Sequence, residues 1–95
     1  MTKLDDARII INNVDRQIAQ LFEERMNASK MVAEYKKENN LPIFDAEREK
    51  IVITNNTEYI QNAELKSYYK LFIQYMMDLS KDYQKAILGK DGEEK

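Results

Sequence analysis

The chain of 95 residues contains no cysteine and no histidine, and it has only one proline and two glycines. Without cysteine it can form neither a disulfide nor a thiolate metal site, and it has no cysteine nucleophile. Without histidine it lacks the commonest metal ligand and the commonest general base near neutral pH. If the chain is an enzyme, we expect its chemistry to depend on the placement of charges and hydrogen-bond donors.

Long apolar runs are also missing. No N-terminal stretch resembles a signal peptide and none is long enough to span a membrane, so we expect a cytoplasmic protein without a membrane partner. The net charge of −2 gives no reason to expect a nucleic-acid partner. With 43% hydrophobic and 34% charged residues and so few turn formers, the composition is typical of a single helix-rich domain.

A long first helix is predicted over residues 3–38, a stretch that contains neither Gly nor Pro. Thr2 and Asp5 have the spacing of a capping box, and Pro42 cannot continue the helix. At about 1.5 Å per residue the helix is on the order of 50 Å long. A compact globule of this size is only about 32 Å across, from a radius of gyration near 12 Å. A single chain cannot cover such a helix, so we predict an obligate homodimer.

Apolar residues follow this helix with steps of three, four and seven. They are Ile11, Val14, Ile18, Leu21, Ala28, Val32 and Tyr35. This is the spacing of a packed helical seam, and Arg25 occupies the missing position inside the seven-residue step. A guanidinium is rarely buried without an anionic partner, so Arg25 is a candidate anion-binding residue.

Two shorter helices complete the predicted fold. The second begins near Asp45, which can act as N-cap, and ends at about residue 56. The third runs from about residue 62 to 88, with Gly89 placed as the stop after its C-terminus. We therefore predict an all-α chain of one long, one short and one medium helix. This helical domain occupies residues 1–90, and a mobile charged tail follows over residues 91–95.

Further cations lie on the first helix. Lys36 follows Arg25 by eleven residues, which is three turns plus roughly 20°, so both side chains point the same way and could hold a small anion. For Lys36 alone, a solvated basic face is the favoured explanation. Arg8 precedes Arg25 by seventeen residues, about 25 Å along a straight helix, so only a partner chain could bring an Arg8 to the same ligand. From position alone, an ordinary surface residue is favoured for Arg8.

Polar groups also interrupt the other two helices. Asp45, Arg48 and Glu49 share one face, either as a cap with a surface ion pair or as a cluster that faces a pocket. Ser80 and Gln84 interrupt an apolar stripe, either because the stripe has reached solvent or because they face a ligand. Together with the cations, these groups imply a small ligand with two carboxylates and at least one hydroxyl. We expect no metal and no cofactor.

At this point the residues resemble a known family, the all-helical chorismate mutases of the AroQ class, over about residues 4–88. Arg8, Asp15 and Arg25 form the pattern R-x6-D-x9-R, and Lys36 follows eleven residues later. The second helix begins with D-x-x-R-E, and the third carries S-x-x-x-Q. Because the set is spread over three helices at fixed separations, it is specific as a whole.

The resemblance implies an intertwined homodimer with two active sites that rearranges chorismate to prephenate, on the route to phenylalanine and tyrosine. The reaction is an intramolecular [3,3] shift without cofactor or covalent intermediate. Arg25 and the partner subunit's Arg8 would hold the substrate carboxylates, assisted by Ser80 and Arg48.

The same resemblance implies roles for the remaining residues. Lys36 and Gln84 would donate to the ether oxygen, where negative charge grows in the transition state. Glu49 and the backbone near Asp45 would bind the ring hydroxyl. Gln84 is the neutral variant of a position that is Glu in some relatives, which implies less loss of rate as pH rises through neutrality.

Two other functions remain as alternatives. Isochorismate pyruvate lyases share the fold and the Arg, Lys and Gln positions, but known members lack the acidic residues of the second helix, so Asp45 and Glu49 favour the mutase. A non-catalytic dimerisation or regulatory module is the second alternative. The complete charged set argues against it.

Overall fold

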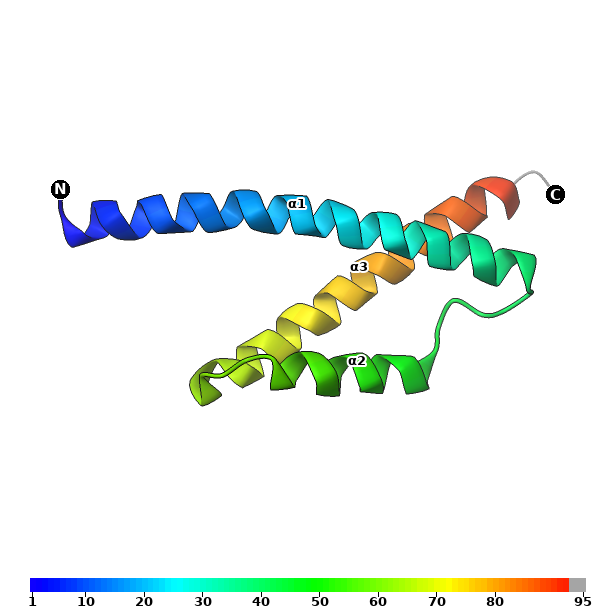
Figure 1. Cartoon of the computed structure of the whole chain (residues 1–95). Coiled ribbons are helices and arrows are strands. Elements are labelled where there is room, and N and C mark those ends of the chain that lie inside the picture. Colours follow the sequence, from blue (N-terminus) through cyan, green and yellow to red (C-terminus); the bar gives the residue numbers. More distant parts are fainter. Residues whose placement is uncertain (93–95) are drawn as a thin grey trace.

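The computed structural model describes residues 1–92, which form three α-helices and one short 3₁₀ turn and contain no strand (Figure 1). The elements are α1 (Lys3–Glu38), α2 (Ala46–Glu58), η1 (Ala63–Leu65) and α3 (Lys66–Gly92). The prediction of an all-α chain with one long, one short and one medium helix is confirmed for these residues.

Helix α1 has the predicted bounds because both of its ends carry strong local signals. The Thr2 hydroxyl accepts a hydrogen bond from the Asp5 amide, and the Asp5 carboxylate accepts one from the Thr2 amide, each at 3.1 Å. This reciprocal capping box satisfies amides that the first turn leaves unpaired. At the other end Asn40 adopts a φ of 55°, a left-handed conformation that Asn tolerates better than most residues.

Helix α2 begins after Asp45, as predicted, because the Asp45 carboxylate accepts a hydrogen bond from the Arg48 amide at 3.1 Å. The helix ends at Glu58, two residues later than expected. Asn62 then caps the 3₁₀ turn η1 by accepting from the Glu64 amide at 3.0 Å. The third helix therefore starts as a tight turn and becomes α-helical only at Lys66.

The predicted stop at Gly89 is wrong, because α3 continues through it to Gly92. Gly89 has a negative φ, and a Cβ added there would meet nothing within 4 Å. It is therefore an ordinary helical residue, although glycine weakens a helix interior relative to alanine. The tail expected over residues 91–95 falls mainly on residues 93–95, which lie outside the described residues.

Helix α3 lies between the other two helices. It packs against both α1 and α2, whereas the backbones of α1 and α2 do not approach each other closely over residues 1–92. In Figure 1, α3 crosses the C-terminal half of α1, and the N-terminal half of α1 extends beyond the crossing. The buried apolar side chains are Ala33, Ile73 and Met77, which belong to α1 and α3. The core of a single chain is therefore small.

The molecule is elongated, with extents of 60 × 26 × 15 Å and a radius of gyration of 17.1 Å. A compact domain of this length would have a radius of gyration near 12 Å. On the projecting half of α1, the seam residues Ile11, Val14, Ile18 and Leu21 are between 43% and 60% exposed. One chain thus leaves much of its longest apolar seam uncovered. Over the described residues, no helix is both long and apolar enough to cross a membrane.

Candidate active site

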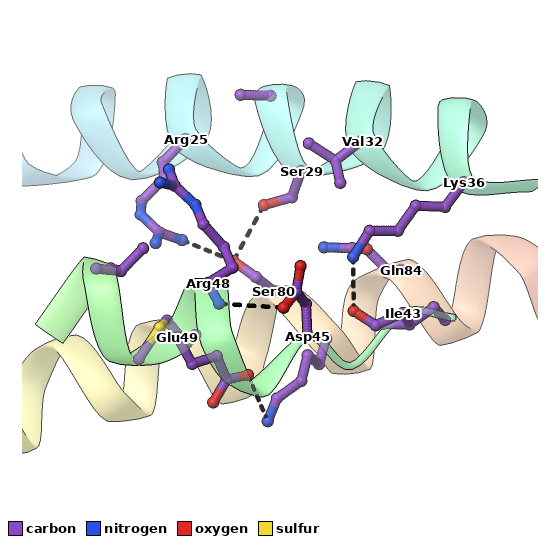
Figure 2. A pocket seen from close by; sticks show the side chains of 14 residues that line it. Arg25, Ser29, Val32, Lys36, Ile43, Asp45, Arg48, Glu49, Ser80 and Gln84 are labelled. Carbon is purple, nitrogen blue, oxygen red and sulfur yellow. Dashed lines mark hydrogen bonds and ion pairs between the residues drawn. The ribbon is translucent and has the colours of Figure 1, made fainter. Parts of the chain in front are cut away.

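A pocket of about 300 Å³ opens between α1, α2 and α3, and it is the place where the polar residues singled out in the sequence meet (Figure 2). Every predicted site residue except Arg8 lines it: Arg25, Lys36, Asp45, Arg48, Glu49, Ser80 and Gln84. Its volume is at the small end of the range for small-molecule sites. Helices that are distant in sequence therefore contribute to one cavity.

The Ser80 hydroxyl is at the centre of a short hydrogen-bond chain. Arg25 donates to it at 2.7 Å and Ser29 donates to it at 3.0 Å, so its oxygen already accepts two hydrogen bonds. Within the described part of the chain, its own proton faces only the Met26 sulfur at 3.9 Å, which is a weak acceptor. Ser80 therefore has a proton available for a stronger acceptor, such as a ligand carboxylate.

Sequence reasoning did not single out Ser29. It lies one helical turn after Arg25, so it shares the face that points into the pocket. Ser29 is only 8% exposed, and its hydroxyl is used to hold Ser80. The signal that could have found it is a polar residue at i+4 from an arginine in an apolar seam.

The Lys36 ammonium closes the end of the pocket opposite the two arginines. It donates to the Ile43 carbonyl at 2.7 Å and thereby ties the last turns of α1 to the loop before α2. In Figure 2 the side chains of Arg25 and Arg48 reach one end of the pocket, and Lys36 and Gln84 lie at the other. The cations are thus separated in the way that a ligand with two anionic or electron-rich ends requires.

The acidic residues of α2 have different partners. The Asp45 carboxylate caps the helix, whereas Glu49 forms an ion pair with Lys81 of α3 at 2.9 Å. The hydrogen bond between Lys81 and Glu49 raises the pKa of Lys81 above its usual 10.5. Nearby Asp78 adds to the effect, while burial opposes it. Sequence reasoning missed Lys81, whose only signal was its position directly after Ser80.

The Gln84 amide is buried, with 7% of the residue exposed, and its Oε1 has no hydrogen-bond partner among the described residues. Ser80 is buried to the same degree. The apolar stripe of α3 has therefore not reached solvent at these residues, which excludes the first of the two explanations offered for them. A buried amide oxygen without a partner is uncommon, and a hydrogen-bond donor on a bound ligand would supply one.

The charges of the pocket favour an anion. Four cationic side chains line it, Arg25, Lys36, Arg48 and Lys81, against the two carboxylates of Asp45 and Glu49. The difference of two formal positive charges matches a ligand with two carboxylates. The profile of the type II chorismate mutases matches residues 7–85 of the chain.

The chain belongs to the type II chorismate mutase family. The matched segment begins one residue before Arg8 and ends one residue after Gln84, so it contains every predicted site residue. The resemblance inferred from the spaced motifs is confirmed by this match.

Two curated relatives come from Buchnera aphidicola, one from subspecies Schizaphis graminum and one from subspecies Acyrthosiphon pisum. Each is a bifunctional chorismate mutase/prephenate dehydratase and is 39% identical to this chain over 82 residues. The alignment covers 84% of this chain but only 21% of each relative, so the chain spans about a fifth of their length. No solved structure gives a significant match.

Arg8 is the one predicted site residue that the single chain keeps away from the pocket. It lies exposed near the start of α1 and does not line the cavity. Arg8 and Arg25 are seventeen positions apart on one continuous helix, which places them about 25 Å apart along its axis. Arg8 cannot reach the pocket of its own chain while α1 stays straight.

Proposed function

We propose that this member of the type II chorismate mutase family converts chorismate to prephenate. The observation that carries the proposal is the convergence of cations, neutral donors and one ionised acceptor in a single pocket. Chorismate has two carboxylates, an ether oxygen and a ring hydroxyl, and the pocket offers a group of suitable chemistry for each. The rearrangement is intramolecular, so it needs neither a nucleophile nor a general base.

The carboxylates are bound at the arginine end of the pocket. Arg25 and Arg48 supply guanidinium groups, which hydrogen-bond carboxylates in a fixed planar geometry. Ser80 adds its free proton, since Arg25 and Ser29 already occupy its oxygen. These contacts hold the enolpyruvyl arm over the ring and reduce the ordering that is left for the transition state.

Lys36 and Gln84 act on the ether oxygen. As the C–O bond breaks, negative charge develops on this oxygen, and donors that are already aimed at it gain strength as the charge grows. Removing one such donor in a comparable site lowers kcat about 10²–10³-fold. Lys36 exchanges its bond to the Ile43 carbonyl for the substrate oxygen, and the Nε2 group of Gln84 donates to the same oxygen.

The ring hydroxyl is bound at the start of α2. Glu49 presents an ionised carboxylate, which only accepts hydrogen bonds and therefore suits a hydroxyl donor. Asp45 is engaged as the helix cap, so its contribution comes through the local backbone that it fixes. This division of roles follows from the different partners of the two acidic side chains.

The active form is a homodimer in which the partner subunit's Arg8 completes each site. The chain exposes 7813 Å², whereas a compact protein of 11.3 kDa exposes about 5,700 Å². The excess is comparable to what one subunit buries in an obligate homodimer. A second hollow of about 720 Å³ lies beside Arg25 and is lined by apolar residues of α1 and α3, including Leu21, Phe72 and Met76. A second copy of α1 would fill it.

An ultraviolet assay of chorismate consumption, with identification of the product, tests the proposal directly. We expect prephenate from chorismate, and no salicylate or pyruvate from isochorismate. Salicylate and pyruvate without prephenate would replace the mutase with a lyase. In addition, Arg25→Leu should abolish turnover while the helical fold and the oligomer persist. If the chain is a non-catalytic module, the wild type should already be inactive, and Arg25→Leu should change no activity.

A further inference from the structure

Lys81 lines the pocket, yet the proposed reaction assigns it no contact with the substrate. It follows Ser80 on α3, and its side chain is 22% exposed. Its ammonium lies 2.9 Å from the Glu49 carboxylate, 3.5 Å from the Asp78 carboxylate and 4.9 Å from the centre of the Phe44 ring. One cation thus joins α3 to the first turn of α2 and to the loop before it.

Several neighbouring groups hold the Lys81 ammonium in place. Asp78 is held in turn by the Gln74 amide, which donates to it at 3.1 Å. The face of the Phe44 ring attracts the ammonium through its quadrupole. A lysine held by two carboxylates and an aromatic ring loses most of its usual freedom, so its position is well defined for a residue so near the surface.

The ion pair with Lys81 restricts the side chain of Glu49. A glutamate has three flexible side-chain torsions, and the Glu49 side chain is 18% exposed, so without a partner it could turn toward solvent. Lys81 binds its Oε2, and no other group in residues 1–92 binds its Oε1. The ion pair thereby keeps the Glu49 carboxylate at one fixed place in the pocket wall.

We propose that Lys81 is a positioning residue that aims the Glu49 carboxylate at the substrate's ring hydroxyl and thereby sets specificity for a hydroxylated ring. The inference rests on the proposed function, because it names what Glu49 binds. Lys81 acts through Glu49 and does not touch the substrate itself. Its effect should therefore disappear when either Glu49 or the hydroxyl is removed.

The test compares Lys81→Met with Lys81→Arg and with Lys85→Met. Methionine keeps the length of the side chain and removes the charge, arginine keeps the charge, and Lys85 is an exposed lysine of the same helix outside the pocket. The substrates are chorismate and the analogue in which hydrogen replaces the ring hydroxyl. Circular dichroism and sedimentation establish that each variant folds and assembles like the wild type, and Lys81→Gln replaces any Lys81→Met chain that does not.

We expect Lys81→Met to lower kcat/KM for chorismate about tenfold, chiefly through KM, as for the loss of one charge-assisted hydrogen bond. For the deoxy analogue, Lys81→Met should lower kcat/KM less than about twofold, because the hydroxyl contact is absent there. Lys81→Arg should recover most of the loss, and Lys85→Met should change nothing. In a Glu49→Gln background, adding Lys81→Met should lower kcat/KM for chorismate by less than a further factor of about two.

The outcomes separate the two proposals. The positioning role is overturned if Lys81→Met lowers kcat/KM equally for both substrates. It is also overturned if the effects of the Lys81 and Glu49 variants on kcat/KM multiply independently. Either result leaves the mutase assignment in place. A wild-type chain that does not consume chorismate overturns the mutase assignment, and the positioning role with it. Selective loss on chorismate together with the interaction between the two residues supports both.

Discussion

At the scale of single residues, the described part of the chain buries as many polar side chains as apolar ones, all on α1 and α3. The polar ones are Ser29, Ser80 and Gln84, and the apolar ones are Ala33, Ile73 and Met77. A buried polar group without a partner destabilises a fold by about 1–3 kcal/mol, and Gln84 has such a group in its Oε1. This unpaired oxygen belongs to a residue to which we assign a substrate contact, so the proposed site and the stability of the fold make opposing demands on residue 84.

The first prediction concerns the protonation state required at residue 84. A Gln84 amide can donate at any pH, whereas a glutamate can donate only when protonated. Gln84→Glu should therefore retain activity in acid and lose kcat steadily as pH rises through the pKa of the new carboxyl, which burial raises above its usual value near 4.3. The measurement is kcat as a function of pH between about 5 and 8, where the wild type should lack this fall.

Gln84→Ala provides the matched control. It should lower kcat by about 10²–10³-fold without the alkaline fall, because it has no donor in either state. A flat profile for Gln84→Glu that follows the wild type would remove residue 84 from the ether-oxygen contact.

The sequence allowed some of the pocket residues to be predicted and not others, for a physical reason. Arg25 and Gln84 interrupt apolar patterns, and such an interruption is visible in one helix alone. Ser29 and Lys81 are a serine and a lysine on helices, which is unremarkable in a sequence. Their contacts with Ser80 and Glu49 depend on how α3 crosses α1 and lies along α2, and that arrangement is not encoded in the spacing of any single helix.

At the scale of the elements, the accuracy of the predicted helix ends follows the strength of the local signals. Two capping side chains determine where α1 and α2 begin, and Pro42 together with Asn40 ends α1 decisively. The third helix carried weaker signals. A lone glycine favours a helix stop only when the chain adopts a left-handed conformation there, and Gly89 does not.

The second prediction follows from this conformation. Gly89→Ala should raise the free energy of unfolding by up to about 0.5–1 kcal/mol, because alanine loses less backbone entropy in a helix and its Cβ meets no atom within 4 Å. Chemical denaturation at constant chain concentration measures the change, since assembly would otherwise contribute to stability. A clear destabilisation would indicate that Gly89 has a left-handed conformation in solution, as a helix stop would require.

At the scale of the whole molecule, shape and site are connected by α1. Its C-terminal half carries Arg25 and Lys36 into the pocket, whereas its N-terminal half carries Arg8 and exposes an apolar seam. Arg25 also borders the second, apolar hollow. A second chain that covered the seam would therefore approach the same guanidinium that lines the pocket. The length of α1 was predictable from the sequence, but the route of a partner chain was not, since it depends on the surfaces of two molecules.

The third prediction tests whether two chains share each site. Arg8→Ala and Arg25→Ala homodimers should both be inactive, because each lacks one carboxylate-binding arginine in both sites. In a mixed dimer, one site combines an intact Arg25 with the partner subunit's Arg8, and the other site lacks both. After unfolding and refolding of an equal mixture, half of the dimers are mixed and each has one working site, so activity per chain should return to about a quarter of the wild-type value.

Differently tagged chains and sedimentation verify that mixed dimers have formed. Purified mixed dimers without activity would mean that Arg8 does not complete the partner's site, and a folded, active monomer would show that the pocket needs no second chain.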